Sequence, residues 1–189
     1  MLKQLYSLLF GLIAAPAKTW EALAVAGKQE PNNEPFYKSY LYPLIGIIAL
    51  MSFFGVWIGS KDFQIQTALK IVIKETITYF GGFYLAANGL FRLSGKYFGL
   101  TANLQSLERF TGYSSAAIYV VACVNALFQS LFYIQIFILY TVYIVWHGSR
   151  FYMVVKENYL TKFTIFASAI VILSPIVIRI IMTLVMPGL

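Results

Sequence analysis

Charged residues divide the chain into long apolar stretches, and the lengths of those stretches predict helices that cross a membrane. No charged residue lies between Ser39 and Ser60, and a second uncharged stretch runs from Thr76 to Phe91. The longest stretch, from 110 to 149, is too long for one ordinary span and fits two spans joined by a tight turn. A transmembrane helix needs roughly 20 predominantly apolar residues. The pattern therefore predicts an all-α, polytopic membrane protein.

Comparing each stretch with that length predicts five transmembrane helices. Their approximate ranges are 40–58, 67–93, 110–127, 131–146 and 161–186. The second span takes in Lys70 and Lys74, whose long side chains can reach the membrane interface from within a helix. Asn125, Gln129 and Ser130 form a polar cluster that we expect to be the turn between the third and fourth spans.

The first 26 residues are amphipathic and precede the first span. The apolar positions near one helical face are Leu2, Leu5, Tyr6, Leu9, Leu12, Ile13, Pro16 and Trp20. This stripe predicts a helix over 1–26 that lies in the plane of the membrane, followed by a polar loop over 27–38. The alternative is a cleaved signal peptide with an A-x-A site at Ala15–Ala17. The stripe continues past that site to Trp20, which favours the in-plane helix.

The composition agrees with lipid as the main solvent of the chain. Of its 189 residues, 60% are apolar and 11% are charged, whereas a soluble domain carries about 25% charged residues. Too few polar groups are present to cover a water-facing surface. The net charge of +7 does not predict nucleic-acid binding, because the basic residues lie between apolar stretches and form no stripe with exposed aromatic side chains.

The basic residues are distributed unequally between the two sides of the five-span arrangement. One side receives ten Lys and Arg residues, and the other side receives four. Cytoplasmic loops of membrane proteins carry an excess of Lys and Arg. The N-terminus is therefore expected in the cytoplasm and the C-terminus on the outer side.

The sequence offers little for catalysis, metal binding or cofactor binding. His147 is the single histidine and Cys123 the single cysteine, and no nucleotide-binding or zinc-protease motif occurs. One alternative is an intramembrane serine hydrolase in which Ser114 pairs with His147. Packing and helix capping explain such a serine more simply, and His147 beside Trp146 is typical of an interfacial residue. We therefore predict a protein that is not an enzyme and has no cofactor or metal.

Ionisable residues within the predicted spans form a stronger signal, because a charge in hydrocarbon is costly unless it is paired. Counting along the helices places Glu75 and Arg179 at similar depth in the outer half of the membrane. We expect Glu75 to pair with Arg179 or with Lys74, and Asn88 to form an interhelical hydrogen bond. A structural pair is the favoured interpretation. The functional alternative is a substrate or ion path past Lys74, Glu75, Asn88 and Arg179.

The order of these features resembles the bacterial branch of the Yip1 family. The segment Leu12–Trp20 resembles the P-x-x-x-W opening of that branch, and Phe110–Ser114 resembles the stretch before its third span. Trp146–Arg150, read as a turn, and the following Lys156–Asn158 resemble its fourth loop. The resemblance covers nearly the whole chain, so 1–189 is expected to be a single domain.

The resemblance implies a five-helix bundle with a cytosolic N-terminus and a periplasmic or luminal C-terminus. Eukaryotic members of the family are implicated in vesicle trafficking and in binding Rab GTPases. Bacteria lack that machinery, and this sequence has no long soluble region before its spans. Neither the activity nor a catalytic residue can therefore be carried over, and the short loops indicate a multi-pass protein of the bacterial inner membrane.

The favoured function is that of a membrane organiser or scaffold whose partners are lipids. The in-plane helix would insert at the cytoplasmic leaflet, with Lys3, Lys18, Trp20 and Lys28 at the lipid interface. The alternative function is a small transporter or channel with polar residues such as Gln135 inside the bundle. Contact with other membrane proteins and homo-oligomerisation are left open.

Overall fold

The fold is a bundle of long helices with shorter helices across one end. The computed structural model describes residues 2–29, 32–59, 63–100, 102–128 and 130–186, with residues 2, 28 and 29 described by backbone alone. The helices are α1 (Leu2–Ala14), α2 (Pro16–Gln29), α3 (Glu34–Phe36), a π-helical turn η1 (Tyr37–Leu41), α4 (Tyr42–Gly59), α5 (Ile65–Phe98), α6 (Leu104–Ser114), α7 (Ala116–Leu127), a 3₁₀ helix η2 (Phe132–Leu139), α8 (Tyr140–Phe151) and α9 (Glu157–Val185). The described residues contain no strand, so the all-α prediction is confirmed.

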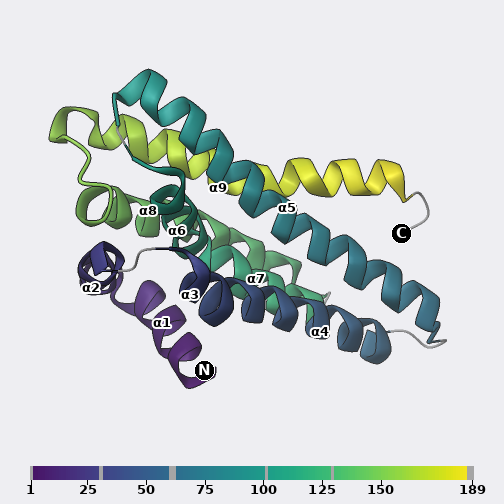
Figure 1. The fold of residues 1–189 in the computed structure, drawn as a ribbon. Helices are drawn as coiled ribbons and strands as arrows, with labels where there is room; N and C mark the ends of the chain where they lie inside the picture. Colours follow the sequence, from purple (N-terminus) through teal and green to yellow (C-terminus); the bar gives the residue numbers. More distant parts are fainter. Residues whose placement is uncertain (1, 30–31, 60–62, 101, 129, 187–189) are drawn as a thin grey trace.

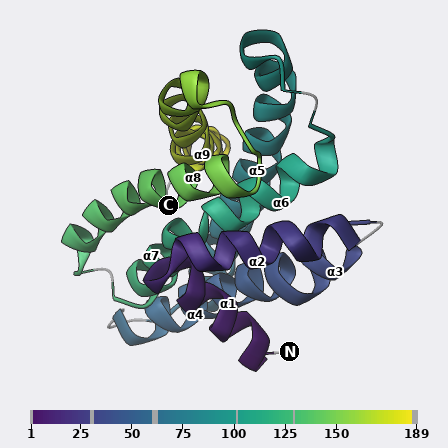
Figure 2. The ribbon, with the colours of Figure 1, turned by 90° about the vertical axis from the view of Figure 1, so that its left-hand side faces the viewer.

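The long helices run in the same general direction, and the N-terminal helices cover one of their ends. In Figure 1, α4, α5, α7 and α9 extend from left to right, whereas α2 is seen end-on at the left. Figure 2 views that end directly and shows α2 and α6 lying across it, with α9 behind and nearly end-on. The C-terminal end of α5 and the N-terminal end of α9 lie at this end of the bundle. Basic residues on these two helix ends, which were predicted to be cytoplasmic, therefore lie there too.

Three stretches of helix are long and apolar enough to cross a membrane. They are Glu34–Gly59, Phe132–Phe151 and Glu157–Val185, and the pair α6–α7 provides a fourth if its two bent parts form one span. The helix α5, predicted as the second span, is long enough with 34 residues, but its composition is not apolar enough to place it among these stretches. By length and composition, the described helices therefore give three or four candidate spans rather than the five expected.

The first span begins earlier than predicted, inside the expected polar loop. Helix α3 starts at Glu34 and continues through the π-helical turn into α4, so the helix starts six residues before the predicted boundary at 40. The N–H of Tyr42 bonds the carbonyl of Tyr37, five residues back. Pro43 has no N–H to donate, and the wider turn lies directly before it. The predicted loop over 27–38 is therefore helical at both ends, up to Gln29 and from Glu34 onward.

The helical segment that contains the predicted third span, 110–127, is longer than predicted and bent. It begins with α6 at Leu104, and the axes of α6 and α7 differ by 46°. The bend lies at Ser115, whose hydroxyl donates to the carbonyl of Thr111 at 2.8 Å. A serine that bonds the carbonyl four residues back often bends a helix. Its neighbour Gly112 lies directly against the ring of Phe36, which brings the bend close to the start of the first span.

The fourth span starts as a 3₁₀ helix and ends later than predicted. Residues Phe132–Leu139 are 3₁₀, and α8 continues to Phe151. The segment Trp146–Arg150, interpreted from the sequence as a turn, is helical. Gly148 within it lies against the indole of Trp20, so a side chain at this position would collide with that ring. Asn125 is also helical, inside α7, and Gln129 lies outside the described residues.

Candidate functional site

The helices α1 and α2 form a hairpin (residues 2–29, the N-terminal hairpin) that is fixed to the bundle by Trp20. The Trp20 indole is fully buried, and its Nε1 donates to the carbonyl of Ile144 on α8 at 3.0 Å. Its ring centroid lies 5.7 Å from that of Phe110 and 5.4 Å from that of Tyr152. The predicted role of Trp20 at the lipid interface is therefore wrong, because its ring and its N–H are both satisfied by protein.

The other helix of the hairpin, α1, is also attached to the bundle. Leu5 and Leu12 from the predicted apolar stripe are buried. The hydroxyl of Tyr140 donates to the carbonyl of Ile13 at 2.7 Å. Part of the apolar stripe thus faces protein, where the sequence pattern alone predicted lipid.

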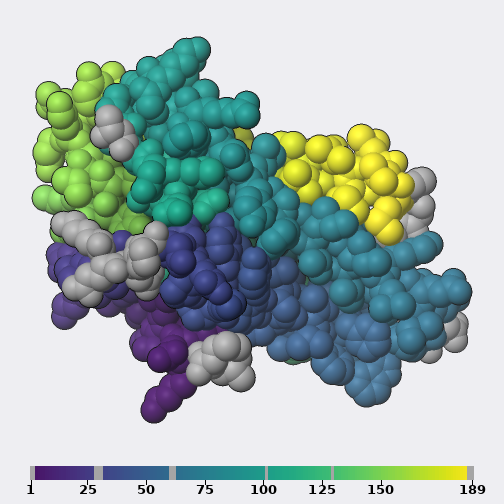
Figure 3. Space-filling view, in the orientation of Figure 1, coloured from purple at the N-terminus to yellow at the C-terminus, as the bar shows by residue number. Residues whose placement is uncertain are grey.

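The opposite face of α1 is exposed and carries two aromatic side chains. Tyr6 is 69% exposed and Phe10 is 60% exposed, and their rings stack with centroids 6.1 Å apart. Figure 3 shows α1 projecting below the body of the molecule. This face is free to contact a lipid interface.

A shallow groove between α1 and α2 brings two of the predicted lipid-interface lysines together. Lys3 and Ser7 from α1 line it, together with Lys18 and Thr19 from α2. The two helices approach closely because Gly11 has no side chain to meet the Thr19 hydroxyl. The side chain of Lys28 lies outside the described residues. The groove presents two ammonium groups and the hydroxyl of Ser7, which are suitable donors to a phosphate group, whereas the hydroxyl of Thr19 already donates to the carbonyl of Ala15 at 3.0 Å.

A buried polar network attaches the segment after α2 to α6. Arg109 is 4% exposed, and its Nε donates to Oδ1 of Asn33 at 2.6 Å. Its Nη1 and Nη2 donate to the carbonyls of Gly27 and Asn32. The amide of Asn33 in turn donates to the carboxylate of Glu108 at 2.6 Å. Arg109 is one of the ten basic residues expected on the cytoplasmic side, and this network was not predicted. The adjacent Glu108 and Arg109 before an apolar stretch were the available signal in the sequence.

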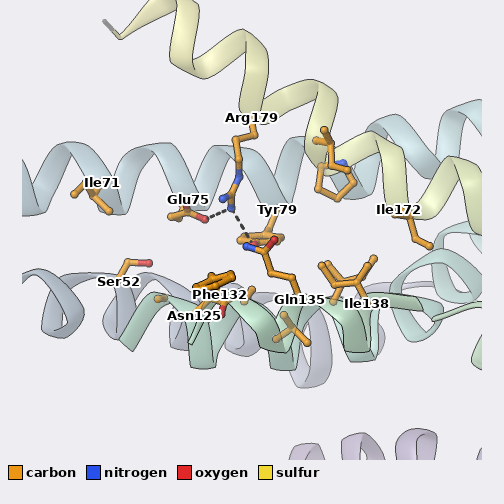
Figure 4. Close-up of a pocket in the computed structure, with 16 residues that line it drawn as sticks. Ser52, Ile71, Glu75, Tyr79, Asn125, Phe132, Gln135, Ile138, Ile172 and Arg179 are labelled. Carbon is orange, nitrogen blue, oxygen red and sulfur yellow. Dashed lines mark hydrogen bonds and ion pairs between the residues drawn. The ribbon is translucent and has the colours of Figure 1, made fainter. Parts of the chain in front are cut away.

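At the other end of the bundle, the predicted ion pair between Glu75 and Arg179 is present. Nη2 of Arg179 lies 2.6 Å from Oε2 of Glu75 and donates to the hydroxyl of Tyr79 at 3.1 Å. Figure 4 shows Arg179 reaching from α9 toward both partners on α5. Glu75 is the more buried partner, since its side chain is 18% exposed and that of Arg179 is 44% exposed.

The ion pair lines a half-open cavity of about 420 Å³ (the Arg179 cavity). Most of its wall is apolar, and the polar contributions come from α4, α5, α7, α9 and η2. Figure 4 shows Asn125 and Gln135 on the wall opposite the ion pair. Oδ1 of Asn125 is buried and has no hydrogen-bond partner among the described residues. An acceptor in this state is suited to a ligand that brings a hydrogen-bond donor.

Two polar residues singled out from the sequence do not belong to this cavity. Asn88 is exposed on α5 and donates to the carbonyl of Tyr84 in its own helix at 2.8 Å. The predicted interhelical bond of Asn88 is therefore absent, because its side chain points away from the neighbouring helices. Lys74 is partly buried next to Glu75, but Arg179 is the ion-pair partner.

The structure does not form the Ser114–His147 pair considered for a hydrolase. The Ser114 hydroxyl and both ring nitrogens of His147 have no hydrogen-bond partner among the described residues, so they do not bond each other. The imidazole instead packs between Tyr143 and Phe151 of its own helix. Within the described part of the chain, no group of three His, Cys, Asp or Glu residues is placed to hold a metal ion.

Comparison with known proteins relates nearly the whole chain to one family. A family model described as the Yip1 domain matches residues 10–186. No curated protein and no solved structure matches the chain. The matched range begins inside α1 and ends just after α9, so it includes most of the N-terminal hairpin, the Asn33–Arg109 network and the Arg179 cavity.

Proposed function

The chain belongs to the Yip1 family, and from that membership we propose that it is an integral, non-enzymatic membrane protein that organises the bilayer. The family consists of membrane proteins and is not known for catalysis. The proposed activity is insertion of the N-terminal hairpin into one leaflet, where it acts as a wedge and a lipid anchor. The bundle holds the hairpin at a fixed depth.

The single observation that carries this proposal is the two-sided character of α1. One side is attached to the bundle through buried Leu5 and Leu12, and the other side exposes the stacked Tyr6 and Phe10. A free peptide would have to order itself at the membrane, whereas this helix is already positioned. Aromatic side chains are enriched at the membrane–water interface, and an apolar helical face lying there enters the boundary between headgroups and acyl chains.

The charges of the hairpin support the same role. Lys3 and Lys18 lie in one groove, and each basic residue near an anionic leaflet contributes about 1 kcal/mol of attraction. The membrane face of the hairpin therefore combines aromatic insertion with electrostatic binding. The excess of basic residues on the side of the hairpin supports the further proposal that this face meets the cytoplasmic leaflet of an inner membrane, with the N-terminus inside and the C-terminus outside.

We include α5 among five spans in this proposal, because its position explains its composition. It packs against both α4 and α9, which are long and apolar enough to be spans. Several of its polar side chains, among them Thr78 and Tyr79, are buried against other helices and do not meet lipid. Low hydropathy is therefore compatible with a spanning helix at this position.

Vesicle deformation tests the proposal. We expect purified protein reconstituted with anionic lipid to tubulate or shrink vesicles, and the double variant Tyr6→Ser/Phe10→Ser to lose most of that activity. The matched control is Tyr133→Ser/Phe137→Ser, which removes an exposed aromatic pair from η2 in the bundle wall. The control should keep the activity. Equal deformation by all three proteins would refute the wedge.

A further inference from the structure

We propose that the Arg179 cavity binds the headgroup of a zwitterionic phospholipid that carries a primary ammonium group, as in phosphatidylethanolamine. The cavity lies at the opposite end of the bundle from the N-terminal hairpin. This inference is therefore independent of the wedge, and either of the two can fail without the other.

The depth of the cavity matches that of a phospholipid headgroup. The apolar helix α9 runs from Glu157 to Val185, and its centre, at residue 171, is expected near the bilayer midplane. At 1.5 Å per residue, Arg179 lies about 12 Å from that centre. The hydrocarbon core ends about 15 Å from the midplane. The guanidinium is thus placed where lipid phosphates meet the acyl region.

The guanidinium has donors left for a phosphate group. Only Nη2 of Arg179 is used by Glu75 and Tyr79 among the described residues. The side chain is 44% exposed, so its other N–H groups can be approached from the cavity mouth. Arginine donates in a planar fork that fits phosphate oxygens.

The hydrogen-bond acceptors of the cavity select the ammonium group of the headgroup. Oδ1 of Asn125 is buried and has no partner among the described residues, and only Oε2 of Glu75 is used by Arg179. Both Oδ1 of Asn125 and the other carboxylate oxygen of Glu75 can accept from N–H or O–H donors. A primary ammonium has three N–H donors, whereas the trimethylammonium of phosphatidylcholine has none. Glu75 and Arg179 also cancel in charge, which favours a zwitterion over an anionic lipid.

The apolar wall offers a path for the acyl chains. Ile172 and Ile176 of α9 line one side, and Phe132 and Ile138 of η2 line the other. A 3₁₀ helix has three residues per turn, so Phe132, Gln135 and Ile138 form one ridge facing the cavity. Because Phe132 and Ile176 are also exposed at the surface, the cavity is open toward lipid between η2 and α9.

Native mass spectrometry of the purified protein, titrated with matched phosphatidylethanolamine, phosphatidylcholine and phosphatidylglycerol, tests the inference. We expect the wild-type protein to retain phosphatidylethanolamine about tenfold better than the other two, the equivalent of one charge-assisted hydrogen bond. Arg179→Gln should abolish the preference. Asn125→Leu should also reduce it while leaving the Glu75–Arg179 pair in place. The matched control is Arg150→Gln, which removes another arginine paired with a glutamate, Glu157, outside the cavity.

Three results would overturn the inference. They are equal retention of the three lipids by the wild type, preference for phosphatidylglycerol, and an unchanged preference in both cavity variants. A soluble headgroup, glycerophosphoethanolamine, distinguishes the source of the ligand. We expect it not to displace the lipid, and displacement at equal concentration would show that the acyl chains are not recognised. Vesicle deformation by Arg179→Gln should be normal, since the hairpin is intact.

Discussion

At the scale of single residues, the same side-chain type serves different roles in different surroundings. Trp20 is fully buried and donates a hydrogen bond to α8, whereas Trp57 near the end of α4 is 57% exposed. Arg109 is buried in a network with Asn33, and Arg150 is exposed. An indole or a guanidinium can be buried only where every donor finds a partner, and these partners come from distant parts of the chain.

Trp20→Ala should destabilise the protein severely, and the matched change at Trp57 should not. Removing a buried Trp costs about 3–5 kcal/mol through lost packing and the cavity left behind. Trp57→Ala should change stability by less than about 0.5 kcal/mol, as for other exposed positions. Thermal unfolding in detergent, followed by intrinsic fluorescence or scattering, measures both. Similar midpoints for the two variants would contradict the anchoring role of Trp20.

At the scale of elements, helix packing depends on small residues at particular positions. A side chain at Gly82 on α5 would collide with the backbone of Pro175 on α9. A side chain at Gly55 on α4 would collide with the carbonyl of Ala126 on α7. Small residues allow close approach of helices in membranes, where dispersion contacts between backbones replace a hydrophobic driving force.

Gly55→Ala should separate α4 from α7, while Gly46→Ala on the same helix should be neutral or stabilising. The added Cβ at position 55 would lie 1.8 Å from the Ala126 oxygen, and overpacking of this kind costs about 1–3 kcal/mol. Position 46 has nothing within 4 Å, so Ala there gains helix propensity of roughly 0.5–1 kcal/mol. Melting temperatures in one detergent check the prediction. A lower melting temperature for Gly46→Ala than for Gly55→Ala would contradict the close contact between α4 and α7 at Gly55.

At the scale of the whole molecule, the two ends of the bundle have different chemistry. One end carries the N-terminal hairpin, the Asn33–Arg109 network and most described basic residues. The other end carries the Arg179 cavity. This asymmetry underlies the proposed orientation, with the hairpin at the cytoplasmic leaflet. The transporter alternative stays a prediction, and proteoliposome flux with Glu75→Gln would test it.

Thiol labelling checks the orientation. In a Cys123→Ala background, Ser7→Cys and Lys156→Cys should be protected from a membrane-impermeant maleimide in right-side-out vesicles. Phe63→Cys, beyond the first span, should be labelled. All three positions are exposed on the protein, so the membrane alone should decide access. Labelling of Ser7→Cys and Phe63→Cys from the same side would show that α4 does not cross the membrane.

Much of the fold was predictable because the cost of placing a side chain in lipid depends mainly on the side chain itself. That cost determined the all-α class, the approximate positions of the apolar helices and the pairing of Glu75 with Arg179. The positions of α4 and α9 followed within a few residues. The bend at Ser115 and the 3₁₀ start of the fourth span did not, since both arise from local hydrogen bonds that apolar patterning does not report.

Only the tertiary structure decided which face of each helix meets protein and which meets lipid. The apolar stripe of the first 26 residues fits either environment, and the contact that buries Trp20 comes from a residue 124 positions away. The same reason explains Asn88, which turned outward, and Arg109, which turned inward. A single sequence records how apolar each position is, and in a membrane both the lipid and the protein interior are apolar, so composition cannot distinguish them.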